Sequence, residues 1–362
     1  MRLAVPTNWD HKLIENLSGL PVENYYAKLQ EDIIGGGRPA SSIPHVTRQK
    51  VKDHIKLIHA NKSLFNYVIN APCLGNIEYA PLYRRQIFKL LDWLTSIEVD
   101  SVTVSIPLLL EWVKRNFPSL KVSVSVFSHV DTISMAKMYE NLGADEITIT
   151  QQFNRDFNFL KGLRKNLKTD FQLIVNNACL FGCPFRRYHS NLNAHSSQTG
   201  SKKLPIDYPV MRCTLLRFKY PAEVIRSPWV RPEDLVHYEK IGIDKFKLSG
   251  RTNTTEWITR TAKSYVSRKS PENFAELLAF PNAAGSIFRK SIPGAPDVNL
   301  VIDNDALSGF IEHFLQKSCS ALPCDKCLYC DRTAQKAVRT SKKLSKELIS
   351  SYEKVLSAFL KI

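Results

Sequence analysis

The sequence lacks the segments that would send a protein out of the cell or into a membrane. Its first ten residues show no charged start, apolar middle and small-residue cleavage site, so we expect no secretory signal. The longest apolar runs, such as Ile106 to Leu110, are far too short to cross a bilayer, so we expect no membrane span. We therefore expect a cytoplasmic protein in a reducing compartment, where thiols stay free to bind metals.

The motifs of several common enzyme classes are also missing. No Ser/His/Asp order and no His-Glu-x-x-His pair are present, which argues against the usual hydrolases. Gly35-Gly36-Gly37-Arg38 offers amides and a guanidinium to an anion, but no phosphate-loop or dinucleotide motif accompanies it. A turn with positive φ explains these glycines better than a nucleotide site does.

Acidic residues are scarce relative to basic ones. The 362-residue chain has 34 Asp and Glu against 50 Lys and Arg, a formal net charge of +16. This excess favours an anionic small-molecule or RNA substrate, or an acidic protein partner. Hydrophobic residues make up 44% of the chain, enough for a substantial core.

Short β-rich runs alternate with helical patterns along the first 250 residues, as in parallel strands joined by crossover helices. The strand candidates are Leu3–Pro6, Tyr25–Ile34, Phe65–Ile69, Ser101–Ile106, Val122–Phe127, Glu146–Thr150, Phe171–Val175 and Lys245–Leu248. Eight such strands predict a TIM-like (β/α)8 barrel, with distortions allowed, and a doubly wound open sheet is the alternative. In a barrel, the residues that follow the strands gather on one face.

The helical patterns fall between these strands, at Thr47–Ala60, Leu82–Ile97, Pro107–Asn116, Thr132–Leu142, Asn154–Leu167 and Pro232–Ile241. Residues 180–229 interrupt the rhythm with a basic segment, which we interpret as an insertion at the active face, or alternatively as a solvated basic loop. We expect a barrel over residues 1–270 and a C-terminal extension over 271–362. The extension contains a stretch marked by proline and glycine from Phe280 to Pro296, a cysteine-rich segment, and an amphipathic helix over Ala334–Leu360 that packs back onto the body.

Seven of the eight cysteines fall in two groups. The first is Cys179, Cys183 and Cys213, and the second is Cys319, Cys324, Cys327 and Cys330. Thiolates at such short spacings can turn toward one metal centre. A [4Fe–4S] cluster needs four thiolates, or three with one open iron, whereas structural zinc needs four closed ligands. Spacing alone leaves the cluster and zinc both open.

The second group is the denser one and resembles the ligand loops of ferredoxins. It could give a fourth thiolate to the first centre, hold a second cluster, or form a zinc site with a histidine such as His313. Cys73 follows the third strand candidate. We expect it to be an ordinary core residue, with a role as fourth ligand as the alternative.

Four basic residues are candidates for binding an anionic substrate. Arg186 and Arg187 follow the first cysteine pair, and Lys247 and Arg251 flank the end of the last strand candidate. His189 and His195 could donate protons or bind phosphate beside the arginines. Alternatively, each of these residues is a solvent-exposed charge or a loop side chain without a functional role.

The sequence resembles the collagenase-like U32 peptidase family. The resemblance rests on Arg231-Pro232-Glu233-Asp234-Leu235, on Ile241 through the strand ending Lys247-Leu248-Ser249-Gly250-Arg251, and on the cysteine pair with Cys213 downstream. It implies a TIM-like barrel with a [4Fe–4S] cluster on four cysteines, of which Cys179, Cys183 and Cys213 match three. It also implies oxygen-independent hydroxylation, which several members of this family perform on quinone precursors or RNA bases.

The chain departs from the family pattern at two positions. No cysteine precedes the Glu-Asp-Leu helix, where Arg226-Ser227-Pro228-Trp229 stands instead, and Ser249 replaces the usual acidic residue. We expect Cys324, Cys327 or Cys330 to supply the missing ligand. The leading hypothesis is an iron–sulfur redox enzyme, hydroxylase-like, served by an electron donor or another protein partner. A metal-stabilised RNA- or protein-binding module and a peptidase are the alternatives.

Overall fold

The computed structural model describes residues 1–362 except 201–203, 205, 280–295, 297, 320–321 and 362. Its centre is a closed barrel of eight parallel strands in sequence order, in which β8 also pairs with β1. The strands are β1 Arg2–Pro6, β2 Val22–Ala27, β3 Leu64–Ile69, β4 Ser101–Val104, β5 Lys121–Val124, β6 Glu146–Thr148, β7 Asp170–Ile174 and β8 Lys245–Lys247. The TIM-like barrel is therefore confirmed, and the open sheet is excluded.

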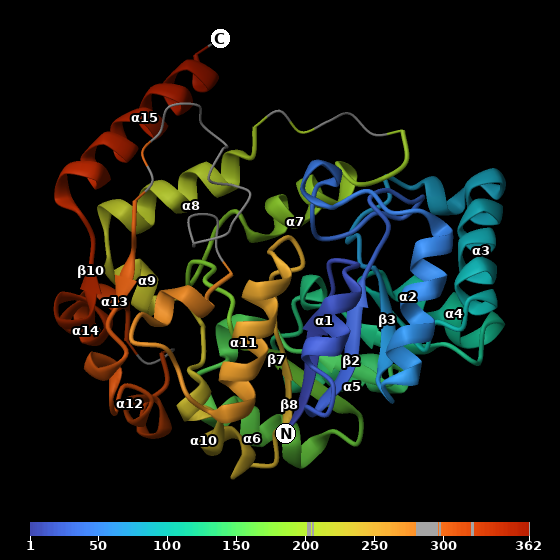
Figure 1. The fold of residues 1–362 in the computed structure, drawn as a ribbon, viewed down its shortest axis with the longest axis horizontal. Coiled ribbons are helices and arrows are strands. Elements are labelled where there is room, and N and C mark those ends of the chain that lie inside the picture. The colour runs from blue at the N-terminus through green and yellow to red at the C-terminus, as the bar shows by residue number, and fades with distance from the viewer. Residues whose placement is uncertain (201–203, 205, 280–295, 297, 320–321, 362) are drawn as a thin grey trace.

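Helices surround the barrel in the order expected of βα units (Figure 1). Those of the barrel are α1 His11–Asn16, α2 Arg48–Ala60, α3 Pro81–Ser96, α4 Pro107–Asn116, α5 Ile133–Asn141, α6 Phe157–Asn166, α10 Leu235–Glu239 and α11 Thr255–Ser267. The inserted segment contributes α7 Arg186–His195, α8 Tyr208–Lys219 and α9 Ala222–Arg226. The later elements are β9 Val301–Ile302, α12 Glu312–Gln316, α13 Cys324–Cys327, α14 Tyr329–Ala337, β10 Val338–Arg339 and α15 Lys342–Leu360.

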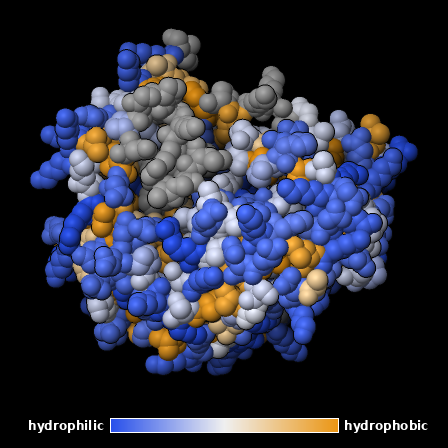
Figure 2. Space-filling view, viewed as in Figure 1, coloured by the Kyte–Doolittle hydropathy of each residue, from blue (hydrophilic) through white to orange (hydrophobic). Residues whose placement is uncertain are grey.

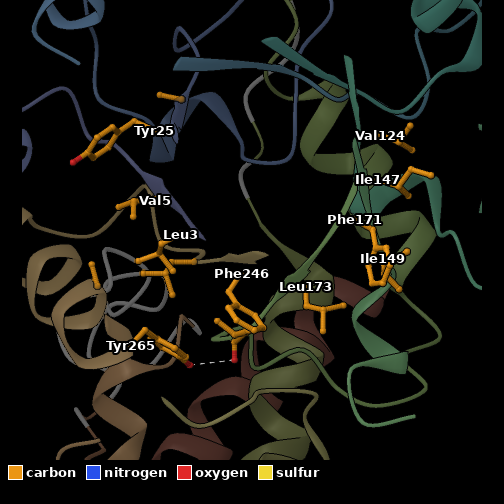
Figure 3. Close-up of a cluster of buried hydrophobic side chains, with 14 of the residues drawn as sticks. Leu3, Val5, Tyr25, Val124, Ile147, Ile149, Phe171, Leu173, Phe246 and Tyr265 are labelled. Carbon is orange, nitrogen blue, oxygen red and sulfur yellow. Dashed lines mark hydrogen bonds between the residues drawn. The ribbon is translucent and has the colours of Figure 1, made fainter. Parts of the chain in front are cut away.

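Alternate residues along each strand point to opposite sides of the barrel wall. Apolar side chains such as Leu3, Phe171 and Phe246 pack into the buried core (Figure 3). The other face of the strands carries polar side chains that bond to one another. Thr103 Oγ1 donates to Asn66 Oδ1 at 2.6 Å, for example. Where its polar groups are partnered in this way, the interior can stay buried without a large penalty.

Strand β2 begins and ends earlier than the sequence predicts. It covers Val22–Ala27 rather than Tyr25–Ile34, because the chain leaves the sheet after Ala27 to form a turn around Asp32. The amides of Ile34 and Gly35 donate to Asp32 Oδ1 at 3.0 and 2.6 Å. Gly35 has a φ of +79°, so the prediction of a positive-φ turn is confirmed there.

Several helices differ from their predicted bounds. The helix expected at Pro232–Ile241 is a 3-10 turn, Pro232–Asp234, followed by α10. The final helix expected over Ala334–Leu360 divides into α14 and α15 at the short strand β10, which pairs with β9. The basic segment after Cys183 is helical in α7 and α8 rather than a long loop.

The C-terminal elements pack directly onto the barrel. Helix α14 packs against α9, and α15 packs along α8, as Figure 1 shows. Phe274, Leu307 and Phe310 belong to the same hydrophobic core as the barrel residues, whereas Leu348 and Tyr352 of α15 form a smaller cluster with α8. The glycine- and proline-marked stretch at 280–295 lies outside the described residues.

Polar side chains cover most of the face shown in Figure 2, and apolar side chains occur there as small scattered groups. Among the described helices, none has the length and apolar character needed to cross a membrane.

Candidate functional site

Three cysteines line one cavity at the face where the strands end, the strand-end face. This cavity, about 120 Å³ in volume, is the thiol pocket, lined by Cys179, Cys183 and Cys213 together with Arg38 and Arg217. Cys179 and Cys183 belong to the loop after β7, and Cys213 lies in the middle of α8. Residues distant in sequence are therefore brought together, in the face where (β/α)8 enzymes carry their active sites.

Local hydrogen bonds hold the loop that carries the first two thiols. Asn177 Oδ1 accepts from the Cys179 amide at 3.1 Å, and Asn177 Nδ2 donates to Gln151 Oε1 at 2.8 Å. Gly182 adopts a φ of +66°, which allows the chain to turn between Cys179 and Cys183. The hydrogen bonds of Asn177 therefore fix the start of the loop, and the positive φ of Gly182 lets the chain reverse direction.

Helix α8 places the third thiol. Asp207 caps the helix by accepting from the Val210 amide at 3.0 Å, and Pro209 occupies its first turn. Arg217, one turn beyond Cys213, donates to Cys213 Sγ at 3.3 Å and also bonds the carbonyl of Ala178. This buried guanidinium therefore links the helix to the cysteine loop.

Burial raises the pKa of the Cys183 thiol and that of the Cys213 thiol, although Arg217 opposes the rise at Cys213. Each thiol also interacts electrostatically with Cys179. Without a metal these groups would stay protonated near neutral pH. Metal binding would displace their protons, as it does at other thiolate sites.

Arg186 and Arg187 occupy different environments despite being neighbours. Arg187 is exposed, whereas Arg186 is largely buried beside Cys179 and Cys183. Arg186 Nη1 is 3.4 Å from Thr150 Oγ1, and its Nε and Nη2 are buried without a hydrogen-bond partner among the described residues. A buried guanidinium with two unused donors fits an anionic group between it and the thiols.

Lys247 and Arg251 are both buried at the barrel mouth. Burial, with help from Arg251 and Lys245, lowers the pKa of Lys247 to about 8, and Glu146 opposes this. Lys247 Nζ lies 4.3 Å from the centre of the Tyr26 ring. Burial and the charge of Arg38 lower the pKa of Arg251 to about 10. Arg251 therefore interacts with a residue of the thiol pocket.

Lys28 is a third buried cation, and the sequence pattern did not identify it as a site residue. It follows β2 directly, forms an ion pair with Asp32 at 3.2 Å, and donates to the carbonyl of Leu29 at 2.9 Å. It lies inside the strand expected at Tyr25–Ile34, so the sequence pattern did not place it at the end of a strand. Arg217 was also missed, although its place one helical turn after Cys213 could have indicated it.

The glycine triplet does not offer free amides to an anion. The amides of Gly35, Gly36 and Gly37 donate to Asp32, Ser197 and Asn70. A Cβ added at Gly35 would lie 2.6 Å from the carbonyl oxygen of Ala194 on α7. The triplet therefore serves close packing between the loop after β2 and the inserted helix.

The tail cysteines gather around a different cavity, the tail cavity. It measures about 230 Å³ and is lined by Cys319, Cys324 and Cys330, with Phe181 and Gly182 of the first cysteine loop also on its wall. The loop between Cys179 and Cys183 thus contributes to both cavities. Whether Cys324, Cys327 or Cys330 provides a ligand to the first centre remains a prediction.

Of the remaining candidates, His189 alone lines the thiol pocket. Cys73 Sγ accepts from the Gly75 amide at 3.3 Å and lines neither cavity. His313 stacks on Tyr329 with ring centres 3.9 Å apart. His189 lines the thiol pocket and pairs with Asp207 at 3.2 Å, and the exposed His195 bonds Gln198.

The donor set consists of thiolates, which serve as ligands in both iron–sulfur clusters and zinc sites. Among the described side chains, no three Cys, His, Asp or Glu groups lie close enough to hold one metal ion. Thiolates that bind different irons of a cluster stand farther apart than thiolates that share one zinc. The three thiols and the unused donors of Arg186 provide ligands and counter-charge for such a group.

Comparison with known proteins agrees with this architecture. The model of peptidase family U32 matches residues 45–202, which include Cys179 and Cys183. The "Uncharacterized protease MJ1657" of Methanocaldococcus jannaschii is 32% identical over 308 residues, covering 85% of this chain and 86% of that protein. The solved structure of the U32 peptidase Mk0906 matches with a TM-score of 0.54 and 21% identity, over 69% of this chain and 93% of that one. The chain therefore belongs to peptidase family U32.

Proposed function

We propose that this protein is an iron–sulfur enzyme that performs an oxygen-independent hydroxylation, or a related redox modification, of an anionic substrate. A [4Fe–4S] cluster on Cys179, Cys183 and Cys213 would supply one-electron redox chemistry at the strand-end face. The observation that carries the proposal is the meeting of these three thiols on one cavity of a TIM-like barrel. Membership in family U32 is consistent with it.

Three protein thiolates would leave one iron with a free position. A substrate atom could occupy that position, or a tail cysteine could close it, as the spacing predicts. A cluster bound by three thiolates carries negative charge in an otherwise buried setting. Arg217, which donates to Cys213, and Arg186, with two unused donors, would balance that charge.

The substrate class follows from the cations around the pocket. Arg38 lines it, Arg251 interacts with Arg38, and Lys247 and Lys28 are buried farther inside the barrel mouth. These residues would hold a carboxylate or phosphate of a small molecule or of RNA. The balanced reaction is R–H plus water giving R–OH, two protons and two electrons, and the electrons would pass singly to an external acceptor protein.

Substitution of the two neighbouring arginines provides a controlled test. In anaerobically purified protein, Arg186→Gln should lower the reduction potential of the cluster, because a buried positive charge beside it is removed. Arg187→Gln should leave the potential close to that of the wild type, since Arg187 is exposed. The two readouts are the visible absorption of the cluster and a redox titration. Absence of iron–sulfur absorption, or equal potentials in both variants, would contradict the proposal.

One observation favours the peptidase alternative. The His189–Asp207 pair lies in the same pocket as the thiols, which is the pairing that a cysteine nucleophile would need. However, burial raises the pKa of Cys183 and of Cys213, which opposes thiolate formation. Peptide hydrolysis by metal-free protein that is lost in His189→Ala would favour the peptidase instead.

The high positive charge favours the other alternative, a module that binds RNA or an acidic protein without catalysis. Such a module would bind with a steep dependence on salt. It would also keep its binding after the cluster was removed. An enzyme whose substrate binds the open iron should instead lose affinity when the cluster is lost.

A further inference from the structure

Three of the four tail cysteines line one cavity, away from the thiol pocket. Cys324 lies at the start of α13 and Cys330 on α14, and both line the tail cavity with Cys319. The thiol of Cys327 interacts electrostatically with those of Cys319 and Cys324. Leu328, with a φ of +54°, turns the chain between α13 and α14. The turn at Leu328 therefore lets Cys324 and Cys330 line the same cavity.

A buried cation lies directly behind these thiols. The Arg155 guanidinium is 7% exposed and donates to the main-chain carbonyls of Ile225, Ser227 and Trp229 at 2.7 to 3.2 Å. It stacks over the Trp229 ring at 4.2 Å and lies 5.3 Å from the centre of the Phe314 ring. The neutral carbonyls accept its hydrogen bonds and the rings pack against it, but neither carries a negative charge that would neutralise the guanidinium.

The structure records no ion pair between Arg155 and a described carboxylate. Cys330 and Cys319 are instead among its main electrostatic neighbours, with Asp234 contributing less. A buried charge without a counter-charge is costly. Four thiolates around an iron–sulfur core carry net negative charge and would offset it.

We propose that Cys319, Cys324, Cys327 and Cys330 bind a [4Fe–4S] cluster of their own, separate from the thiol pocket, with Arg155 as its buried counter-charge. Three of these cysteines line the tail cavity of about 230 Å³, and Arg155 lines it too. Three of the cysteines also stand at two-residue gaps, as in ferredoxin loops.

The position of this cluster gives it a role that rests on the proposed function. Phe181 and Gly182 line the tail cavity, while Cys179 and Cys183 on either side of them line the thiol pocket. One five-residue loop therefore separates the two sites. Cys319 is exposed, so the tail site lies close to solvent. The tail cluster would pass electrons between an external redox protein and the inner cluster.

Iron and sulfide analysis of anaerobically purified variants tests the inference. The wild type should contain about eight irons per chain, and Cys324→Ser with Cys330→Ser should leave about four. Cys73→Ser, outside both cavities, is the matched control and should keep about eight. Loss of all iron from both the tail variant and a Cys183→Ser with Cys213→Ser variant would overturn the proposal, since a single shared cluster behaves in that way. Zinc in the tail site, or iron unchanged in the tail variant, would overturn it as well.

The same analysis separates the two proposals. If Cys183→Ser with Cys213→Ser keeps the full iron content and the tail variant loses it all, the function proposed for the thiol pocket fails while a tail cluster stands. Arg155→Met offers a second readout should the serine variants unfold. It should lower the potential of one cluster only, and Arg155→Lys should restore most of it. Potentials unchanged in Arg155→Met would count against the counter-charge role.

Discussion

At the scale of single residues, the most informative side chains are cations buried where the barrel opens. Lys247 is the last residue of β8 and is 8% exposed, and burial lowers its pKa to about 8. Such residues cost stability, and the proposed anionic substrate would offset that cost. The sequence identified Lys247 and Arg251 because they end a strand.

Removing this charge should stabilise the protein. The folded pKa of Lys247 is about 8 against an ordinary 10.5, so below pH 8 its full charging penalty is present, about 3 kcal/mol. We expect Lys247→Met to raise the free energy of unfolding at pH 7 by about 1–3 kcal/mol while weakening binding of anions. Urea denaturation with and without a polyanion would measure both effects.

The stability gained by Lys247→Met should decrease as the pH rises above 8. Between pH 8 and 10.5 the unfolded lysine binds a proton that the folded one has lost, so wild-type stability rises with pH relative to the variant. The advantage of Lys247→Met should therefore shrink as the pH approaches 10.5. An advantage that stays constant from pH 7 to 10 would contradict the buried-charge account.

Other site residues were beyond sequence reasoning for physical reasons. Arg155 resembles any helix-preceding arginine until the fold surrounds it with Trp229 and Phe310. The difference between Arg186 and Arg187 likewise depends on which side of α7 faces the thiols. A single sequence carries no periodic signal strong enough to assign that side.

At the scale of elements, the strands were predicted better than the helices of the insertion. Runs such as Val102 and Val104, or Phe171 and Leu173, alternate apolar and polar positions as half-buried strands do. Helix α7 carries mostly polar residues and gave no apolar stripe to detect. It is held instead by tertiary contacts, including those with the glycine triplet.

The contact between the glycine triplet and α7 can be tested with a matched pair of substitutions. Gly35 and Gly19 both have positive φ, at +79° and +77°, so alanine is strained at each by about 1 kcal/mol. Only at Gly35 would the added Cβ also strike a backbone carbonyl, that of Ala194. We expect Gly35→Ala to cost at least about 2 kcal/mol and Gly19→Ala about 1.

Chemical denaturation of the two variants measures this difference. Because α7 begins with Arg186, we also expect Gly35→Ala to disturb the thiol pocket more than Gly19→Ala does. Equal losses of stability in both variants would show that the packing of the triplet against α7 is unimportant.

At the scale of the whole molecule, the barrel and the C-terminal elements form one packed body. Phe310 and Phe314 join the barrel core, and α14 packs against α9, so the tail cysteines are held against the loop of Cys179 and Cys183. The sequence predicted a tail that folds onto the body. It left open whether the tail thiols supply a ligand to the first centre, hold a second cluster or bind zinc, because that depends on where α13 and α14 turn.

The most direct test of the account is the iron bound by the thiol pocket. Iron and acid-labile sulfide should be measured in anaerobically purified wild type and in a variant with Cys179, Cys183 and Cys213 all replaced by serine. The account predicts that the variant loses about four irons and four sulfides per chain. Equal iron in both proteins, or zinc in place of iron in the wild type, would contradict it.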